Sequence, residues 1–263
     1  MQPSVEGAAS MYAAERQAHI LSLARRDGRV EVSALAADLA VTPETVRRDL
    51  TALERRGGLR RVHGGAIPVE RMDLEPTMTD RTESHSAEKA RIAKAALDLV
   101  PEQGTVLIDG GTTTALLAQH FPTDRDLTVV TTSLPVANAL VGVQRIDLHL
   151  IGGYVRGRTL TAVGDWVIHA LADLCVDVAF LGTNGISVAR GLTTPDQREA
   201  SAKRAMVEAA RQVVVLADHT KVGVDHFARF ASLSAISTVI TDSGVDPEDA
   251  EALTTAGPEV IRA

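Results

Sequence analysis

Residues 42–50 read Thr-Pro-Glu-Thr-Val-Arg-Arg-Asp-Leu, a pattern that predicts the start of a helix. Thr42 is a good cap for the first turn, and Pro43 suits the first helical position because its missing N–H is not needed there. Three apolar residues then recur at helical spacing and define the buried face: Val46, Leu50 and Leu53. The polar residues between them turn to the opposite side or its flanks, where they can touch DNA: Thr45, Arg47, Arg48 and Thr51.

The segments on either side complete a winged helix-turn-helix pattern. Apolar periodicity predicts one helix over residues 15–26 and a second over residues 33–39, with a tight turn before Thr42. After the third helix, residues 59–65 alternate apolar and basic side chains and end in two glycines, as a two-stranded wing would. In such a motif the third helix lies in the major groove, and the basic residues of the wing hold the DNA backbone: Arg60, Arg61 and His63.

The charge distribution separates this N-terminal region from the rest of the chain. The protein has 263 residues and a net charge of −7, yet residues 12–65 hold ten arginines and no lysine against seven acids. The remainder holds seventeen basic and twenty-seven acidic residues, so only the N-terminal region suits DNA phosphates. Charged side chains on solvent-exposed faces also produce such a difference in charge between two regions. The alternative to a DNA-binding motif is therefore a three-helix bundle with a basic, solvated face. The capped helix, the close turn and the basic hairpin, in this order, favour the DNA-binding motif.

Two stretches, residues 42–50 and residues 60–66, resemble the N-terminal signature of DeoR-type repressors. Members of that family carry a winged helix-turn-helix ahead of a sugar-phosphate-sensing domain related to ribose-phosphate isomerases. We therefore expect a DNA-binding domain over residues 12–67 and an effector-binding domain over residues 85–260. The polar stretch between them, residues 68–84, contains two prolines and lacks sustained periodicity, which is typical of a linker.

The second domain is predicted to be α/β, with a mainly parallel sheet. Residues 105–109 form an apolar run that leads into glycines and threonines and then into a helix over residues 114–120. Similar apolar runs recur at residues 127–132, 176–181, 212–217 and 237–241. Near-continuous apolar strands indicate a sheet that is covered on both faces.

Small polar residues follow these strands, at the edge where ligands bind in sheets of this kind. They are Asp109, Gly111, Thr112, Thr113, Thr131, Ser133, Gly152, Gly153, Asn184, Gly185, Asp218 and Lys221. The helix start after Asp109 offers free backbone N–H groups and hydroxyls, which suit an anion such as phosphate. One isolated turn of this kind is usually structural, but five in equivalent places predict a single polar pocket.

Glu199 and Lys203 lie four residues apart on a predicted helix, close enough to pair. They form either an exposed ion pair or part of the pocket, because a phosphate sensor needs a cation that Lys203 or Lys221 can supply. The family resemblance favours the pocket, since members have a Glu-x-x-x-Lys stretch here. It also implies a phosphorylated sugar as effector. Residues 192–196 and 217–223 are similar to actinobacterial regulators of fructose uptake, which implies fructose 1-phosphate.

An enzyme is the main alternative function. The isomerases to which the resemblance points use carboxylates and lysines, and Asp109, Glu199 and Lys203 would then act as acid and base in a sugar-phosphate isomerase. An isomerase has no need of a DNA-reading module, which argues against this interpretation. A constitutive DNA-binding protein is a third interpretation, but it leaves the polar pocket unexplained.

Several other classes are disfavoured by what the sequence lacks. It contains no metal-binding or cofactor-binding motif, so no metal and no cofactor is expected. It has no signal-peptide pattern and no apolar run of membrane-spanning length, so we expect a cytoplasmic protein with no membrane partner. The single cysteine, Cys175, lies in an apolar stretch and is expected to be a buried, inert thiol.

The residues and the resemblance together predict a DNA-binding transcriptional repressor of a sugar uptake or catabolism operon. Its partners are double-stranded operator DNA and a phosphorylated sugar that releases it. Closed symmetry makes a homodimer or homotetramer the expected assembly.

Overall fold

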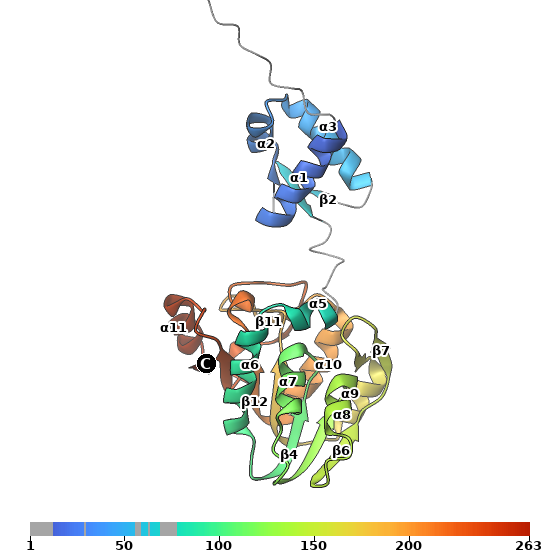
Figure 1. The fold of residues 1–263 in the computed structure, drawn as a ribbon, viewed down its shortest axis with the longest axis vertical. Coiled ribbons are helices and arrows are strands. Elements are labelled where there is room, and N and C mark those ends of the chain that lie inside the picture. The colour runs from blue at the N-terminus through green and yellow to red at the C-terminus, as the bar shows by residue number, and fades with distance from the viewer. Residues whose placement is uncertain (1–12, 29, 56–58, 63, 69–77) are drawn as a thin grey trace, which may run out of the picture. The chain divides into compact units, whose positions relative to one another are not determined.

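The computed structural model describes residues 13–28, 30–55, 59–62, 64–68 and 78–263. The chain divides into two compact units, Met1–Glu75 and Pro76–Ala263 (Figure 1). Each unit has its own apolar core, and each is described by itself below.

The N-terminal unit is a winged helix-turn-helix. Its helices are α1 (Ala13–Asp27), α2 (Val32–Asp38) and α3 (Pro43–Arg55). Its antiparallel sheet has the order β1-β3-β2, formed by β1 (Val30–Glu31), β2 (Leu59–Val62) and β3 (Gly65–Pro68). The helices and the wing share one core that includes Ile20, Leu35, Val46, Leu50 and Leu59. The predicted helices and the predicted hairpin are confirmed, while β1 was not foreseen because two residues carry no periodic pattern.

Helix α3 begins as its sequence predicts. The Thr42 hydroxyl accepts a hydrogen bond from the Thr45 N–H at 3.2 Å, which caps the first turn. Val46 and Leu50 are fully buried against the other helices. The sequence did not indicate a role for Asp49, which is also buried on this helix. Its two carboxylate oxygens accept from Arg16 Nε at 2.6 Å and from Gln17 Nε2 at 2.9 Å, so they tie α3 to α1.

Asp49→Ala is expected to lower the free energy of unfolding of the N-terminal unit by about 3–5 kcal/mol, because it leaves the largely buried Arg16 without this carboxylate. Hydrogen exchange of the α3 amides in the full chain, followed by mass spectrometry, measures the loss for this unit alone. Arg48→Ala is the control on the same helix, since its side chain is exposed and its removal should change stability by no more than about 0.5 kcal/mol. Equal protection in the two variants would contradict the structural role of Asp49.

The C-terminal unit is built on a seven-stranded parallel sheet with the order β15-β14-β12-β9-β4-β5-β6. In chain order the strands are β4 (Gln103–Ile108), β5 (Asp126–Thr131), β6 (Ile146–Leu150), β9 (Val176–Gly182), β12 (Ala210–Leu216), β14 (Thr238–Thr241) and β15 (Glu259–Arg262). The predicted parallel α/β domain is confirmed. The edge strands β6 and β15 were not among the predicted apolar runs, because three of the five residues of β6 and two of the four residues of β15 are exposed and the apolar pattern is broken.

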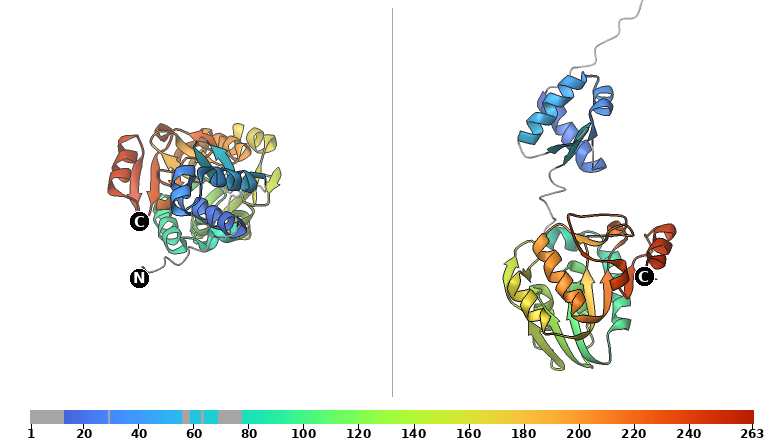
Figure 2. Two further views of the ribbon diagram at one scale, coloured as in Figure 1. Left: turned by 90° about the horizontal axis from the view of Figure 1, so that it is seen from above. Right: turned by 180° about the vertical axis from the view of Figure 1, so that it is seen from behind.

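Helices cover both faces of this sheet. One face packs against α6 (Ser86–Ala96), α7 (Thr112–Gln119) and α8 (Leu134–Leu140). The other packs against α9 (Asp165–Ala172) and α10 (Gln197–Glu208). Along β4, Val106 and Ile108 belong to the first core and Leu107 to the second, as the alternation of side chains in a strand requires. Figure 1 shows α6 and α7 in front of the sheet, and the rear view in Figure 2 shows α10 in orange on the opposite side.

The order of the strands changes direction between β4 and β9. The chain runs from β4 outward through β5 to β6, then returns to place β9 on the other side of β4. Ligands bind in open parallel sheets at such a switch point, beyond the carboxyl ends of the strands. Short antiparallel strands surround that edge: β7 (Tyr154–Arg156) with β8 (Thr161–Val163), and β10 (Gly185–Ser187), β11 (Gly191–Thr194) and β13 (Ala228–Ala231).

Two expectations are corrected by the structure. Part of the expected linker is the helix α5 (Met78–Glu83), which the sequence hides because no residue of this helix is buried and Met78 is its only apolar residue. Cys175 is exposed, because it lies in the turn between α9 and β9, ahead of the buried part of that strand. In the described residues, no helix combines the length and the apolar character needed to cross a membrane.

Candidate functional site

The outer side of α3 gathers the side chains that the sequence predicts for DNA contact. An open hollow on this unit is lined by Thr45, Arg47, Arg48, Thr51 and Arg61, together with residues of α1. Thr42 and Pro43 are exposed at the start of the helix, and Arg60 lies in β2. His63 lies outside the described residues. The structure therefore brings the outer side of α3 and Arg61 of the wing to one surface.

Hydrogen bonds hold part of this surface in place. Arg61 Nη1 of the wing donates to Thr51 Oγ1 at 3.3 Å, and the Arg61 N–H donates to Glu54 Oε1 at 3.0 Å. Arg47 Nη1 forms an exposed ion pair with Glu44 Oε2 at 3.0 Å. Arg48 is exposed and, within the described part of the chain, has no hydrogen-bond or ion-pair partner. Arg48 is therefore the arginine of α3 whose guanidinium is not engaged within the described part of the chain, and its contact with DNA stays a prediction.

Arg48→Ala is expected to weaken binding to operator DNA by about 1–3 kcal/mol, the usual size of one lost base contact. Binding of a labelled promoter fragment at fixed salt, followed by fluorescence anisotropy, measures the change. Arg190→Ala removes the same charge from an exposed position of the C-terminal unit and serves as the control. If both variants bind like the parent protein, α3 is not the recognition helix.

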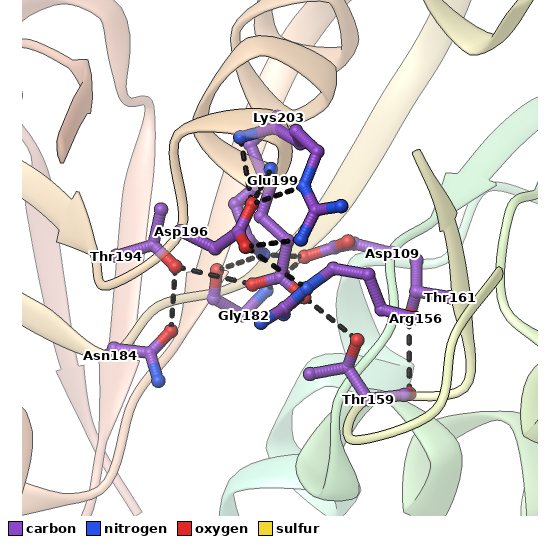
Figure 3. Close-up of polar contacts among 11 residues, drawn as sticks. Asp109, Arg156, Thr159, Thr161, Gly182, Asn184, Thr194, Asp196, Glu199 and Lys203 are labelled. Carbon is purple, nitrogen blue, oxygen red and sulfur yellow. Dashed lines mark hydrogen bonds and ion pairs between the residues drawn. The ribbon is translucent and has the colours of Figure 1, made fainter. Parts of the chain in front are cut away.

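A buried ion pair closes the carboxyl edge of the sheet in the C-terminal unit. Asp109 follows β4, and its Oδ2 accepts from Lys203 Nζ of α10 and from the Gly182 N–H at 3.1 Å. Lys203 Nζ also donates to the Gly182 carbonyl oxygen at 2.9 Å. Figure 3 shows Asp109 and Lys203 pointing toward each other across Gly182. The pair thus joins the ends of β4 and β9 to the helix that covers them.

Glu199 has a different set of partners. One of its oxygens accepts from Arg156 Nη1 and from Thr159 Oγ1, the latter at 2.7 Å, and the other accepts from Thr194 Oγ1 at 3.2 Å (Figure 3). Of the two alternatives, the exposed ion pair between Glu199 and Lys203 is therefore wrong, because each side chain pairs with a group on another element and Glu199 is 5% and Lys203 6% exposed.

The space around these ion pairs is small. A cavity of about 20 Å³ lies among Asp109, Thr161, Asn184, Glu199 and Lys203. This volume is about that of one water molecule. Asn184 Oδ1 accepts from Thr194 Oγ1 at 3.2 Å and so belongs to the same network. The predicted residues Asp109, Asn184, Glu199 and Lys203 come together around one small cavity, where they bond to other groups of the protein.

A larger cavity of about 240 Å³ adjoins this network and shares Arg81, Gly182 and Thr183 with the smaller one. Its wall includes residues 111–114, where α7 begins, and Asp218 and Lys221 after β12. Thr112 is 5% and Thr113 7% exposed, and within the described residues neither hydroxyl has a hydrogen-bond partner. The first turn of a helix also leaves its backbone N–H groups without intrahelical acceptors. Several hydrogen-bond donors without acceptors, the two hydroxyls and the backbone N–H groups of the first turn of α7, therefore lie at the same wall of the cavity.

Three basic residues contribute to the same cavity: Arg81 of α5, Lys89 of α6, and Lys221. Lys89 is buried, and its Nζ donates to the carbonyl oxygens of Arg81 and Ser84. Burial lowers the pKa of the Lys89 ammonium, and the nearby Asp218 carboxylate offsets part of that shift. Sequence analysis missed Lys89 and Arg81. Lys89 precedes Ile92, Ala93 and Ala96 at helical spacing, so a lysine on the apolar stripe of a helix was the available signal.

Several predicted residues are not on this wall, each for a structural reason. Thr131 is the last residue of β5, and Ser133 lies in the turn that follows. Both are buried, and Thr131 Oγ1 donates to the Ile108 carbonyl while Ser133 Oγ caps α8. Gly185 lies in β10, where a side chain would collide with the Val224 carbonyl. Gly152 lines a separate apolar hollow beside Trp166, and Gly153 follows it. Within the described residues no group of acidic, histidine and cysteine side chains has the arrangement of a metal site.

Asp109→Ala is expected to lower the free energy of unfolding of the C-terminal unit by about 3–5 kcal/mol, because it leaves the Lys203 ammonium buried and unpaired. Urea unfolding followed by circular dichroism measures the change. Asp126→Ala is the control, since Asp126 pairs with Arg145 on the exposed surface and its loss should change stability little. This result would make Asp109 a poor probe of ligand binding, and a stable Asp109→Ala protein would contradict the structural role of the pair.

Comparison with known proteins identifies both units. The chain matches the DeoR-like helix-turn-helix domain over residues 16–71 and the DeoR C terminal sensor domain over residues 84–243. It is 38% identical to the HTH-type transcriptional regulator GlpR of Haloferax volcanii, over 95% of this chain and 98% of that protein. It is 31% identical to the Glycerol-3-phosphate regulon repressor of Escherichia coli K12, over 87% of this chain and 90% of that protein. Ribose 5-phosphate isomerase A from Methanocaldococcus jannaschii aligns with a TM-score of 0.40 and 19% identity, over 53% of this chain and 55% of that chain.

Proposed function

The chain belongs to the DeoR family of transcriptional regulators, and from that premise we propose that it is a repressor whose effector phosphate binds where α7 begins. One observation carries the proposal: Thr112 and Thr113 are largely buried residues that line a cavity, and their hydroxyls have no hydrogen-bond partner among the described residues. Hydroxyls that no protein group uses can donate to a ligand in that cavity, so this arrangement favours a ligand that accepts from both of them.

The chemistry of the cavity selects an anion. The start of a helix presents free N–H groups and the positive end of the helix dipole, which together favour phosphate. Lys221 adds a positive charge on the same wall, and Lys89 adds another. Lys203, the other cation that the sequence indicated, is occupied by Asp109 and is not available. A cavity of about 240 Å³ suits a small phosphorylated ligand, whose sugar we place along Gly182 and Thr183.

The isomerase alternative is not supported. The relatives named above over most of this chain are transcriptional regulators. The carboxylates of Asp109 and Glu199 are also engaged by Lys203 and Arg156, so neither is placed to take a proton from a substrate. In this proposal they hold the inner end of the site and do not perform chemistry.

The identity of the sugar and the assembly extend the proposal. We infer fructose 1-phosphate as the first candidate, and the name of the Escherichia coli relative makes glycerol 3-phosphate the second. We further propose that a dimer or tetramer in the cytoplasm holds two winged helices at operator half-sites, and that the effector weakens this arrangement. A coupling of about 1–3 kcal/mol between the two sites is typical of such regulators.

The decisive experiment titrates the complex of the full chain and its own promoter DNA with fructose 1-phosphate, fructose 6-phosphate and glycerol 3-phosphate at fixed salt. Release of DNA by one of these three phosphorylated compounds supports the proposal and identifies the effector. Tight DNA binding that no phosphorylated sugar alters would overturn the effector class. Turnover of a sugar phosphate without specific DNA binding would support the isomerase alternative instead.

The double variant Thr112→Val and Thr113→Val is expected to bind operator DNA like the parent protein but to need much more effector for release. Each lost hydrogen bond to a charged ligand costs about 1.5–3 kcal/mol, or roughly tenfold or more in affinity. Isothermal titration calorimetry measures the affinity, and Thr123→Val, at an exposed position, is the control. An unchanged affinity in the double variant would place the phosphate elsewhere.

A further inference from the structure

Helix α5 is a short element that buries none of its side chains. It has only six residues, Met78–Glu83. A helix of this length is not stable by itself in water, so its structure depends on what holds it. It is also the first described element after residues 69–77, the segment that joins the two units. Any ligand that changes how firmly α5 is held therefore changes the point at which the joining segment is attached to the C-terminal unit.

Lys89 supplies the contact that holds the end of α5. Its Nζ donates to the carbonyl oxygens of Arg81 and Ser84, in the last turn of that helix and just beyond it. A cation at the C-terminal end of a helix satisfies carbonyls that have no intrahelical donor and interacts favourably with the helix dipole. The connection to α6 is tight as well, because His85 has a positive φ of 52° and its ring meets the edge of the His219 ring.

The same ammonium belongs to the wall of the effector cavity. A lysine has three N–H donors, and the two carbonyls account for two of them. Neither carbonyl carries a full negative charge, so the buried ammonium is only partly compensated. Asp218 is the carboxylate with the largest favourable effect on this charge, but one Asp218 oxygen already accepts from the N–H and the hydroxyl of Thr220. A phosphate at the start of α7 would bring the missing charge.

Helix α5 forms part of the cavity through Asp80 and Arg81, and Ser84 just beyond the helix contributes as well. An anion between α7 and α5 attracts the Arg81 guanidinium and the Lys89 ammonium. Asp80 repels an anion, which favours a position deep in the cavity, near Thr112 and Lys89. A bound anion therefore contacts Arg81 of α5 directly. It also stabilises the Lys89 ammonium, which holds the end of the same helix.

We propose that Lys89 couples the effector cavity to α5, so that a bound anion fixes this helix and an empty cavity leaves it free to detach. The inference rests on the proposed function, because it takes the anion site at α7 as its starting point. Detachment of residues 78–85 would lengthen the connection between the units by up to roughly 28 Å if these residues were extended. That difference in reach is large enough to decide whether two winged helices of one assembly meet both operator half-sites.

Hydrogen exchange of the full chain with and without inorganic phosphate tests the coupling, because two peptides report two events. Protection of residues 111–115 reports binding at α7, and protection of residues 78–84 reports the state of α5. In the parent protein both are expected to exchange several-fold more slowly with phosphate. In Lys89→Met, raised phosphate should still protect residues 111–115 but leave residues 78–84 unchanged, and Lys89→Arg should restore the response. Lys94→Met, at an exposed position of the same helix, is the control.

The outcomes separate the two proposals. Protection of α7 without protection of α5 in the parent protein would overturn the coupling and keep the anion site. Protection of α5 in Lys89→Met to the same extent as in the parent protein would overturn the role of Lys89. No protection of α7 at any phosphate concentration would overturn the anion site, and the coupling with it.

Discussion

Every charge buried at the carboxyl edge of the seven-stranded sheet needs a partner, and this requirement arranges the sensor unit. Asp109 leaves β4, Gly182 ends β9, and Lys203 reaches both from α10, so one ion pair joins two neighbouring strands to the helix above them. Arg156 satisfies Glu199 in the same way. Because these groups satisfy one another, the inner end of the crevice is filled, and the space that remains lies beside the start of α7.

The DNA-binding unit obeys the same requirement with different residues. Asp49 lies on the recognition helix but faces inward, where Arg16 and Gln17 of α1 satisfy its carboxylate. The helix is thereby fixed against its neighbour by polar as well as apolar contacts. The side chains left on its outer face, Thr45, Arg48 and Thr51, are then presented by a rigid support, which is the condition for reading base edges in a groove.

Communication between the units depends on the chain that joins them. The acidic sensor unit is not suited to DNA phosphates, so a signal from its cavity must reach the basic unit through the connection or through the assembly. Helix α5 is placed for the first route, because it contributes to the cavity and follows the joining segment directly. In the proposed coupling the short length of α5 and its lack of buried side chains matter, since only a weakly held element changes state for the free energy that one ligand provides.

Local patterns in the sequence were sufficient for the helix-turn-helix, the cap at Thr42, the wing and the parallel sheet, because each depends on neighbours a few residues apart. They also indicated a helix start after Asp109, because that feature depends on one strand, one turn and one helix, while phosphate binding at residues 111–113 stays a prediction. Which residues share a cavity was decided only by tertiary structure. Lys203 meets Asp109 across 94 positions and not Glu199 four positions away, because burial brings together the ends of distant elements, and spacing along one helix does not record that. Lys89 lies on the wall of the larger cavity for the same reason.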